Sequence, residues 1–398
     1  MIKVVVDSDI PYIKGVLEPF ASVEYKKGKD ISRSDAMNSD ALIIRTRTKC
    51  NEQMLNGGRV RFIASATIGR DHVDEEFCER AGIRFTNAAG CNAWGVVQYV
   101  YTAIFHIASG RCATLPANQI IPRWLGRSGD LKGVTIGIIG AGNVGERLAS
   151  VAENFGLRVL RCDPPLKALL MKNHNLFDGD PLRNGISESD YHTLDEVLTR
   201  SDIVTLHVPL NGETFGMADT SFFASMKDGA LFINSSRGEV VDEDALIKAI
   251  ITGKVDNAVI DVWRGEPEIN RNLLGISTIA TPHIAGYSLE GKINATTMSV
   301  RSFAEYFGIE GLKNFSIGTE SLSSSFVDGL RLINDSCSSV ENDSCTDSIA
   351  RALESLFPIG EDNLKLRRDP SKFEELRSEY NYRREIPSEV FHFIANLL

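Results

Sequence analysis

The stretch Val134-Thr-Ile-Gly-Ile-Ile-Gly-Ala-Gly-Asn-Val-Gly145 decides the fold of this chain. Its first half is apolar and β-branched, which is typical of a short buried strand. Its second half spaces Gly140, Gly142 and Gly145 as G-x-G-x-x-G and leads into a helical pattern. In this setting the glycines permit a tight turn, close approach of a pyrophosphate, and close packing of helix on strand, so they predict a dinucleotide-binding unit. Because a helix N-terminus offers N–H donors to anions, we expect the cofactor phosphates to lie against Gly140, Gly142, Asn143, Val144 and Gly145.

An acidic residue, Asp163, follows the next predicted strand, Arg158–Cys162. A carboxylate at this position accepts hydrogen bonds from ribose hydroxyls and repels the 2′-phosphate of NADP. The alternative is a glycine turn with an unrelated surface acid, but the strand, the glycines and the acid occur in the order that the motif requires. The sequence therefore predicts NAD, rather than NADP, as the cofactor.

Composition and charge exclude several classes of protein. The 398 residues include 43 Lys+Arg and 53 Asp+Glu, which gives a formal net charge of −10. An acidic chain without a basic tract is a poor ligand for nucleic acid or an anionic membrane, so we expect neither partner. The seven scattered cysteines contain no C-x-x-C motif, which indicates reduced thiols and no metal site. Without a signal-peptide core or an apolar stretch of membrane-spanning length, the chain is expected to be cytoplasmic.

Short apolar strands alternate with helical patterns in two series. The first series is predicted at 2–6, 41–44 and 60–66, and the second at 134–139, 158–162, 202–206, 230–234, 257–262 and 277–281. Such alternation predicts an α/β fold with two Rossmann-like, doubly wound parallel-sheet domains and a cleft between them. We expect a substrate-binding domain over 1–95, completed by 286–310, and a dinucleotide-binding domain over 96–285. A connecting loop is predicted at 109–130, a helix at 287–308, a Ser-rich linker at 321–325, and a small, mostly helical region at 326–398.

Three later segments place an ionisable residue just beyond a predicted strand, namely Arg237, Glu266 and His283. Because the carboxyl ends of parallel strands face one crevice, the three side chains can converge beside the cofactor. Oxidation of a hydroxy acid needs such a set. A guanidinium binds the carboxylate, an imidazole takes the hydroxyl proton, and a carboxylate holds the imidazole in one tautomer. Each residue alone could be a surface ion pair, a turn acid or a strand-end histidine, but together they predict a catalytic site.

The chain resembles the D-isomer-specific 2-hydroxyacid dehydrogenase family in four stretches, namely Ala66–Asp74, Gly90–Ala93, Asp261–Glu268 and His283–Lys292. A fifth stretch, Phe373–Glu385, resembles part of that family's C-terminal dimerisation domain. The Cys91-Asn-Ala93 and His283-Ile-Ala-Gly-Tyr287 blocks resemble the branch of that family which oxidises 4-phospho-D-erythronate with NAD in pyridoxal 5′-phosphate biosynthesis. The resemblance implies catalytic roles for Arg237, Glu266 and His283, and a homodimer held together by residues 326–398.

The resemblance also implies contacts for each ligand. The expected NAD contacts beyond the glycine loop are Asp163, Val208, Ser236, Asp261 and Gly286, and the expected substrate contacts are Thr46, Thr67 and Tyr287. Val208 replaces a threonine of that branch, so a backbone contact with NAD would survive there, whereas a hydroxyl contact would not.

A cationic run, Arg45-Thr-Arg-Thr-Lys49, follows the predicted strand 41–44. If the chain stays extended, its period of two aims Arg45, Arg47 and Lys49 to one side, where they would bind the substrate phosphate. The alternative is a solvated turn in which only Arg45 matters.

Two other functions stay open at this point. The chain could act on another D-2-hydroxy acid, such as 3-phosphoglycerate, which substrate kinetics would reveal. It could also be a non-catalytic, NAD-sensing protein of the same fold, although the presence of all three catalytic residues favours an enzyme.

Overall fold

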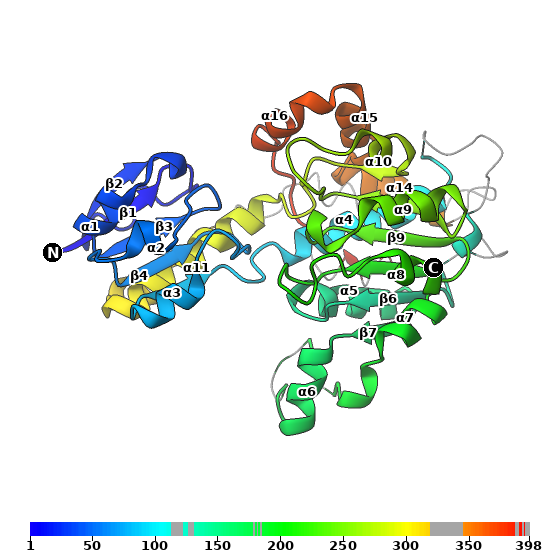
Figure 1. The fold of residues 1–398 in the computed structure, drawn as a ribbon, viewed down its shortest axis with the longest axis horizontal. Helices are drawn as coiled ribbons and strands as arrows, with labels where there is room; N and C mark the ends of the chain where they lie inside the picture. Colours follow the sequence, from blue (N-terminus) through cyan, green and yellow to red (C-terminus); the bar gives the residue numbers. More distant parts are fainter. Residues whose placement is uncertain are drawn as a thin grey trace. The chain divides into compact units, whose positions relative to one another are not determined.

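The computed structural model describes residues 1–112, 122–125, 131–177, 180, 182–183, 185–318, 345–386, 390–391 and 394. The chain divides into two compact units, one of Met1–Asn92 and Ser288–Ser321 and the other of Ala93–Tyr287 and Leu322–Leu398 (Figure 1). The predicted linker at 321–325, and most of the predicted loop at 109–130, lie outside the described residues. Each unit is built on one parallel sheet, which confirms the predicted α/β class.

The sheet of the first unit has the order β2-β1-β3-β4-β5. Its strands are β1 (Ile2–Asp7), β2 (Ala21–Lys26), β3 (Ala41–Ile44), β4 (Phe62–Ser65) and β5 (Arg84–Asn87). Successive side chains of a strand point to opposite faces, so each face has its own core. One core is shared with α1 (Arg33–Asn38), α2 (Glu52–Leu55) and α3 (Glu75–Arg80), and the other with α11 (Leu289–Phe307) and α12 (Glu310–Lys313). The long α11 therefore completes a unit whose sheet lies more than 200 residues earlier.

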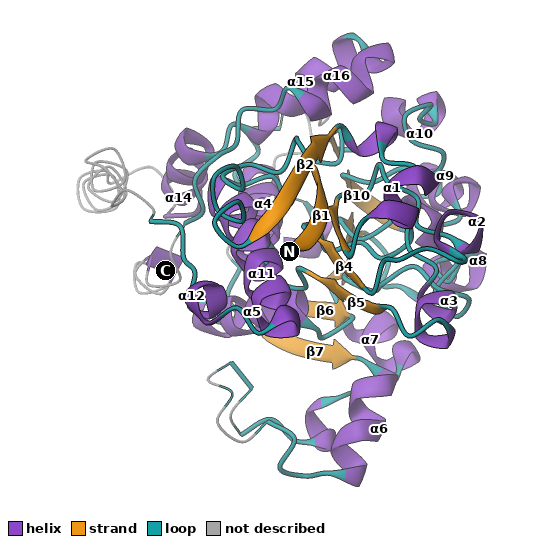
Figure 2. Ribbon diagram, turned by 90° about the vertical axis from the view of Figure 1, so that its left-hand side faces the viewer, coloured by secondary structure: helices purple, strands orange, loops and turns teal. Residues whose placement is uncertain are grey.

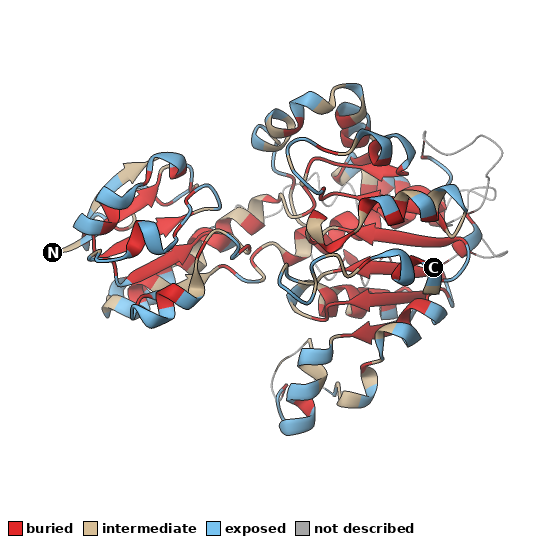
Figure 3. Cartoon of the chain, viewed as in Figure 1, coloured by how far each residue is buried: buried red, intermediate tan, exposed pale blue. Residues whose placement is uncertain are grey.

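The sheet of the second unit has the order β11-β10-β9-β8-β6-β7. Its strands are β6 (Thr135–Ile139), β7 (Arg158–Cys162), β8 (Ile203–Leu206), β9 (Ala230–Asn234), β10 (Val255–Ile260) and β11 (Ile279–Ala280). Two apolar cores again cover its faces, one with α4 (Ala93–Ala108) and α5 (Asn143–Asn154), the other with α7 (Leu194–Arg200), α8 (Thr220–Ser225), α9 (Glu243–Ile251) and α10 (Arg271–Ile276). The central strands of both sheets, such as β3, β4, β6, β8 and β9, are buried along their whole length (Figure 3). Helix α6 (Pro164–Lys172) lies at the β7 edge of the second sheet (Figures 1 and 2).

The strand order reverses at β6, which pairs with β7 on one side and with β8 on the other. In open parallel sheets the crevice beyond the carboxyl ends of the strands at such a reversal is where dinucleotides bind. The glycine loop follows β6 at this place, and the loop that begins at His207 follows β8. The topology therefore puts the motif of the sequence at the binding position of the fold.

The C-terminal segment packs into the second unit. Helix α14 (Cys345–Leu356) lies along α4, α15 (Ile359–Arg368) lies beside β11, and α16 (Phe373–Ser378) follows. Leu353, Phe357 and Phe373 are fully buried in the cores of this unit. Most of the apolar side chains that the structure describes in this segment are thus buried against the same chain, so they are not available to contact a partner.

The structure differs from the sequence-based prediction mainly at the sheet edges. The nine predicted strands are found within two residues of their expected bounds, but β2 and β5 were not predicted. Both are edge strands with half-exposed, mixed polar sequences, so neither shows the apolar run that marks a central strand. Among the described residues, no helix is long and apolar enough to cross a membrane.

Candidate active site and dinucleotide-binding loop

The glycine loop after β6 is shaped by close contacts. Gly140 has a φ of 91°, and a Cβ there would lie 2.6 Å from the carbonyl carbon of His207. A Cβ on Gly145 would lie 2.2 Å from the Gly140 oxygen, so α5 can begin this close to the strand only with glycine at that position. By contrast, a Cβ on Gly142 would meet nothing within 4 Å. The loop therefore has an open backbone surface at the N-terminus of α5, which fits the approach of a pyrophosphate.

Asp163 ties the end of β7 to this loop. Its Oδ2 accepts a hydrogen bond from the Ala141 N–H at 3.0 Å, and its Oδ1 accepts one from the Leu166 N–H at 3.0 Å, which caps α6. A carboxylate has about four acceptor positions, so each oxygen keeps capacity for a ribose hydroxyl. The residues present therefore fit an NAD adenosine at this loop.

The loop after β9 is organised by Asn234, a residue that sequence reasoning did not single out. Its Oδ1 accepts from the backbone N–H and the hydroxyl of Ser236 at 3.1 and 2.8 Å, and its Nδ2 donates to the Arg237 carbonyl at 3.0 Å. The following Gly238 approaches the next loop so closely that a Cβ would lie 2.0 Å from the Trp263 carbonyl carbon. These contacts bring the Arg237 loop against the loop that carries Glu266. In the sequence, the signal for this role is only an Asn at the end of a predicted strand.

Glu266 and His283 form a hydrogen-bonded pair. Oε2 of Glu266 lies 2.8 Å from Nδ1 of His283, and Oε1 accepts from the Trp263 N–H at 3.0 Å. Burial by itself raises the pKa of the Glu266 carboxyl, but the contacts with His283, the Trp263 N–H and Arg377 outweigh burial and lower it. His283 has a φ of 58°, a left-handed conformation that is uncommon outside glycine and is concentrated at functional sites. The structure thus brings together two of the three predicted catalytic residues, and it keeps the carboxylate ionised.

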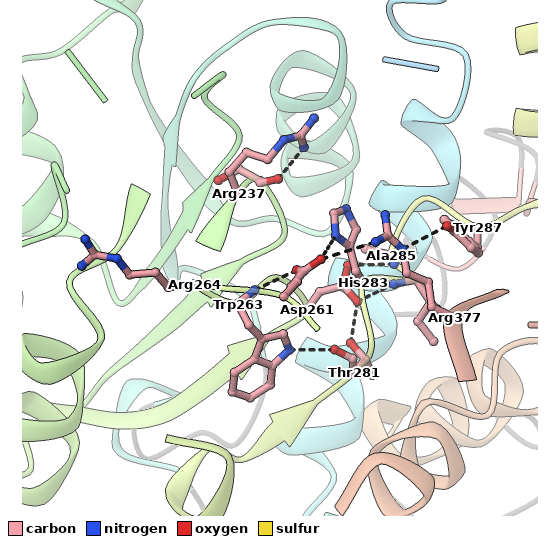
Figure 4. A network of polar contacts seen from close by, with 12 residues as sticks. Arg237, Asp261, Trp263, Arg264, Thr281, His283, Ala285, Tyr287 and Arg377 are labelled. Carbon is pink, nitrogen blue, oxygen red and sulfur yellow. Dashed lines mark hydrogen bonds and ion pairs between the residues drawn. The ribbon is translucent and has the colours of Figure 1, made fainter. Parts of the chain in front are cut away.

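Asp261, which follows β10, holds the His283 loop in this conformation. Its Oδ1 accepts from the Thr281 hydroxyl at 2.7 Å and the Ile284 N–H at 2.8 Å, and its Oδ2 accepts from the Ala285 N–H at 2.9 Å. Burial raises the pKa of this carboxyl, and these hydrogen bonds act in the opposite direction. Figure 4 shows Asp261 and His283 in the middle of the polar network, with Arg237 to one side and Arg377 and Tyr287 to the other.

Two other expected NAD contacts lie in neighbouring loops. Val208 directly follows His207, whose backbone closes against Gly140, and Gly286 directly precedes Tyr287. Burial lowers the pKa of His207 to about 3, and its Nε2 lies 2.8 Å from the Thr205 hydroxyl. His207 is therefore a neutral, packed side chain at ordinary pH.

The C-terminal segment supplies two arginines that sequence reasoning did not connect with this site. Arg377 contacts Tyr287 and Glu266, and Arg383 donates to the carbonyls of the loop after His283. Nothing in the local sequence indicates these contacts, because roughly a hundred residues separate the partners.

The expected substrate residues of the first unit lie at the carboxyl ends of two paired strands. Arg45 and Thr46 directly follow β3, and Thr67 lies two residues after the end of β4. The residue before Thr67, Ala66, donates its N–H to the Ile44 carbonyl at the end of β3. The Arg45 Nη1 donates to the Asp9 carbonyl at 2.6 Å, and the Thr67 hydroxyl lies 2.7 Å from that of Ser65.

The extended course considered for residues 45–49 is wrong. The Thr48 N–H donates to the Arg45 carbonyl at 3.1 Å, and the buried Thr48 hydroxyl donates to the Gly28 carbonyl at 2.8 Å. The chain turns here because Thr48 is drawn inward. Because the chain is not extended, the alternation that would aim Arg45, Arg47 and Lys49 to one side is lost.

Among the side chains that the structure describes, no group of three His, Cys, Asp or Glu residues is arranged to hold a metal ion. The five cysteines whose thiols the structure describes are buried and form no disulfide, namely Cys50, Cys78, Cys91, Cys112 and Cys162. Burial raises the pKa of the Cys50 thiol to about 12, so it stays protonated and unreactive.

Comparisons with known proteins point to one family of enzymes. Residues 121–285 match the NAD binding domain of D-isomer specific 2-hydroxyacid dehydrogenases. Erythronate-4-phosphate dehydrogenase of Bacteroides thetaiotaomicron is 40% identical over 388 residues, which cover 96% of this chain and 97% of that protein. The Escherichia coli enzyme of the same name is 38% identical over 313 residues, which cover 77% of this chain and 74% of that protein.

Solved structures share the fold at lower identity. D-lactate dehydrogenase of Aquifex aeolicus, complexed with NAD and lactic acid, has a TM-score of 0.61 at 24% identity and matches 80% of this chain and 100% of its own. NAD-bound 3-phosphoglycerate dehydrogenase of Entamoeba histolytica has a TM-score of 0.60 at 23% identity and matches 80% of this chain and 99% of its own. With its glycine loop, its His–Glu pair and a relative that is 40% identical over 96% of its length, the chain belongs to the erythronate-4-phosphate dehydrogenase family, among the D-isomer specific 2-hydroxyacid dehydrogenases.

Proposed function

We propose that this chain oxidises the C2 hydroxyl of 4-phospho-D-erythronate to (R)-3-hydroxy-2-oxo-4-phosphobutanoate, with NAD as the oxidant, in the biosynthesis of pyridoxal 5′-phosphate. The observation that carries the proposal is the Glu266–His283 pair, which lies in the NAD-binding unit of a chain 40% identical to an erythronate-4-phosphate dehydrogenase. Such a pair is the acid–base device that removal of a hydroxyl proton needs.

His283 is the proposed proton acceptor, and its contact with Glu266 supports Nε2 as the ring nitrogen that acts. Because Glu266 is ionised and faces Nδ1, the neutral imidazole carries its proton on Nδ1 and donates it to Oε2. Nε2 then holds the lone pair that takes the proton of the C2 hydroxyl. As the proton leaves the oxygen, the C2 hydrogen departs with its electron pair and the C–O bond becomes a carbonyl. NAD⁺, when bound, supplies the hydride acceptor. Glu266 stabilises the imidazolium that results.

The remaining predicted residues complete the proposal. Arg237 would bind the substrate carboxylate and polarise the developing carbonyl, because a guanidinium matches planar oxygen pairs. NAD would be surrounded by the predicted cofactor residues, namely Gly140, Gly142, Asn143, Val144, Gly145, Asp163, Val208, Ser236, Asp261 and Gly286. Arg45, Thr46, Thr67 and Tyr287 would contact the substrate, with Arg45 at the phosphate.

The proposed function is tested by following NADH formation with 4-phosphoerythronate, 3-phosphoglycerate and D-lactate in parallel. We expect kcat/KM to be highest for 4-phosphoerythronate. A higher kcat/KM for 3-phosphoglycerate would mean that another hydroxy acid is the substrate. NAD binding without turnover of any of the three compounds would favour a non-catalytic NAD sensor.

A homodimer in a reducing cytoplasm is also part of the proposal. The five described thiols, which form no disulfide, support a reducing compartment. The dimer is supported by the resemblance of Phe373–Glu385 to a dimerisation domain, but not by Leu353, Phe357 and Phe373, which are buried within the chain. Sedimentation equilibrium of the full chain is expected to give twice the mass of one chain, and a single-chain mass at micromolar concentration would contradict the dimer.

A further inference from the structure

Arg377 reaches the Glu266–His283 pair from outside the dinucleotide-binding domain. It lies on α16, in the C-terminal segment. Its Nη1 is 3.5 Å from Oε2 of Glu266, the same oxygen that faces His283. Its Nε donates to the Tyr287 hydroxyl at 3.1 Å, and the guanidinium lies 6.0 Å from the centroid of the Tyr287 ring. One side chain therefore links the acid of the pair to an expected substrate contact.

The position of Arg377 is held from both sides. Before it, Phe373 is fully buried in the core of the second unit. After it, Arg383 is buried and donates from Nη1 to the carbonyls of Ile284 and Tyr287 at 2.9 and 3.0 Å, while its Nη2 donates to Gly95 at 2.9 Å and also to Ala285. These bonds clamp the segment to the loop that carries His283. Arg377 is thus not a loosely held surface cation, although about a quarter of its side chain is exposed.

We propose that Arg377 is a positioning residue of the hydride-transfer site: it orients the Glu266 carboxylate toward His283 and holds Tyr287 at the substrate, so that the C-terminal segment completes the active site. This inference rests on the proposed function, since it assigns Arg377 a part in that reaction. It gives the segment a role in catalysis that does not depend on dimerisation.

The electrostatic consequence has a definite sign. Besides Arg377, the ionisable groups that bear on the pair are Asp261, which interacts with His283, and Tyr287 and Glu374, which interact with Arg377. Arg377 is one of the contacts that lower the pKa of Glu266. Loss of this cation makes protonation of the pair more favourable. Because oxidation needs the unprotonated imidazole, the acidic limb of kcat/KM would move to higher pH.

The test compares Arg377→Gln and Arg377→Lys with a matched control, Arg367→Gln. Arg367 is also a half-buried arginine of the segment, and it donates to Leu274 at 2.6 Å, to Ser277 and to Asn363 at 2.9 Å. It touches neither Glu266, His283 nor Tyr287 in these contacts. We expect Arg377→Gln to move the acidic limb upward by about 0.5–1 pH unit and to lower kcat about tenfold, with NAD affinity unchanged. Arg377→Lys should recover part of the shift, and Arg367→Gln should keep the wild-type profile even if its Tm falls.

A substrate-independent measurement keeps the inference separate from the proposed function. The imidazole resonances of His283, identified by their loss in His283→Ala, report the titration of the pair in the NAD complex. We expect the midpoint to rise in Arg377→Gln and not in Arg367→Gln. A wild type that does not oxidise 4-phosphoerythronate would remove the proposed function, whereas an unchanged midpoint in Arg377→Gln, or an equal shift in Arg367→Gln, would refute the role of Arg377.

Discussion

Replacement of Glu266 by Gln tests how the proton acceptor is prepared. The change keeps the size of the side chain but removes the charge that lies 2.8 Å from His283 Nδ1. A hydrogen bond to a charged group contributes about 1.5–3 kcal/mol, so its loss from an imidazolium-like transition state lowers kcat about 10- to 150-fold. The variant also changes which imidazole tautomer is favoured. The Trp263 N–H, 3.0 Å from the other carboxylate oxygen, needs an acceptor, and this fixes which way the amide of the variant points.

The amide oxygen of Glu266→Gln will face Trp263, so its NH₂ will face His283 and will favour a lone pair on Nδ1. The imidazole proton then moves to Nε2, which can no longer accept the substrate proton. The combined fall in kcat is expected to be about 10²- to 10⁴-fold, with NAD affinity nearly unchanged.

Glu243→Gln is the matched control for this prediction. Glu243 is a buried carboxylate that accepts from the Arg264 N–H at 2.9 Å, and an amide oxygen can take over that bond. We expect Glu243→Gln to change kcat less than about threefold. Steady-state NADH kinetics and fluorescence titration with NAD measure both variants. If Glu266→Gln lost less than tenfold in kcat while folded, or if Glu243→Gln lost as much, the acid–base role of Glu266 would be wrong.

Three further predictions follow from the geometry. Asp163→Ala should weaken NAD binding and reduce the preference for NAD over NADP, because it removes both the acceptor for the ribose hydroxyls and the charge that repels the 2′-phosphate. An unchanged ratio of kcat/KM for the two cofactors would mean that Asp163 only caps α6. Arg45→Ala should raise KM for the phosphorylated substrate much more than for unphosphorylated erythronate, and equal losses on both would place Arg45 in the fold. His106 beside Glu354 has its pKa raised from 6.5 to about 9, against the opposing effect of burial and through contacts with Cys112 and Glu354. The His106–Glu354 contact therefore contributes of the order of 1–3 kcal/mol to the free energy of unfolding below about pH 6.5, and this contribution is lost as pH rises through 9. In urea unfolding, the free energy of unfolding of His106→Gln should depend less on pH over this range than that of the wild type. An equal pH dependence in the two proteins would show that His106 is not its source.

Local sequence patterns predicted the central part of the fold well. The strands β3, β6, β8 and β9 are short apolar runs buried on both faces, and such runs are visible without any partner. The edge strands β2 and β5 lack this signal, because one side of an edge strand is solvated and its sequence is mixed. The turn at residues 45–48 escaped prediction for a different reason, since it depends on the burial of Thr48 against Gly28, twenty residues earlier in the chain.

The sequence by itself determined those features that depend on the conformational limits of a few adjacent residues. Gly140 needs glycine because of its positive φ, and both Gly140 and Gly145 need it because a Cβ would collide with nearby backbone. Gly142 leaves the backbone surface between them open, and Asp163 follows at the spacing that the motif requires. Strand-end positions also predicted that Glu266 and His283 converge, but the geometry of their contact and the distant groups that join it were decided only in the tertiary structure. His283 faces Glu266 in a loop that Asp261 holds in place, and Arg377 joins the pair because the chain returns to bury Phe373 and Arg383. Such long-range contacts are selected by packing of the whole unit, and packing leaves no periodic pattern in the local sequence.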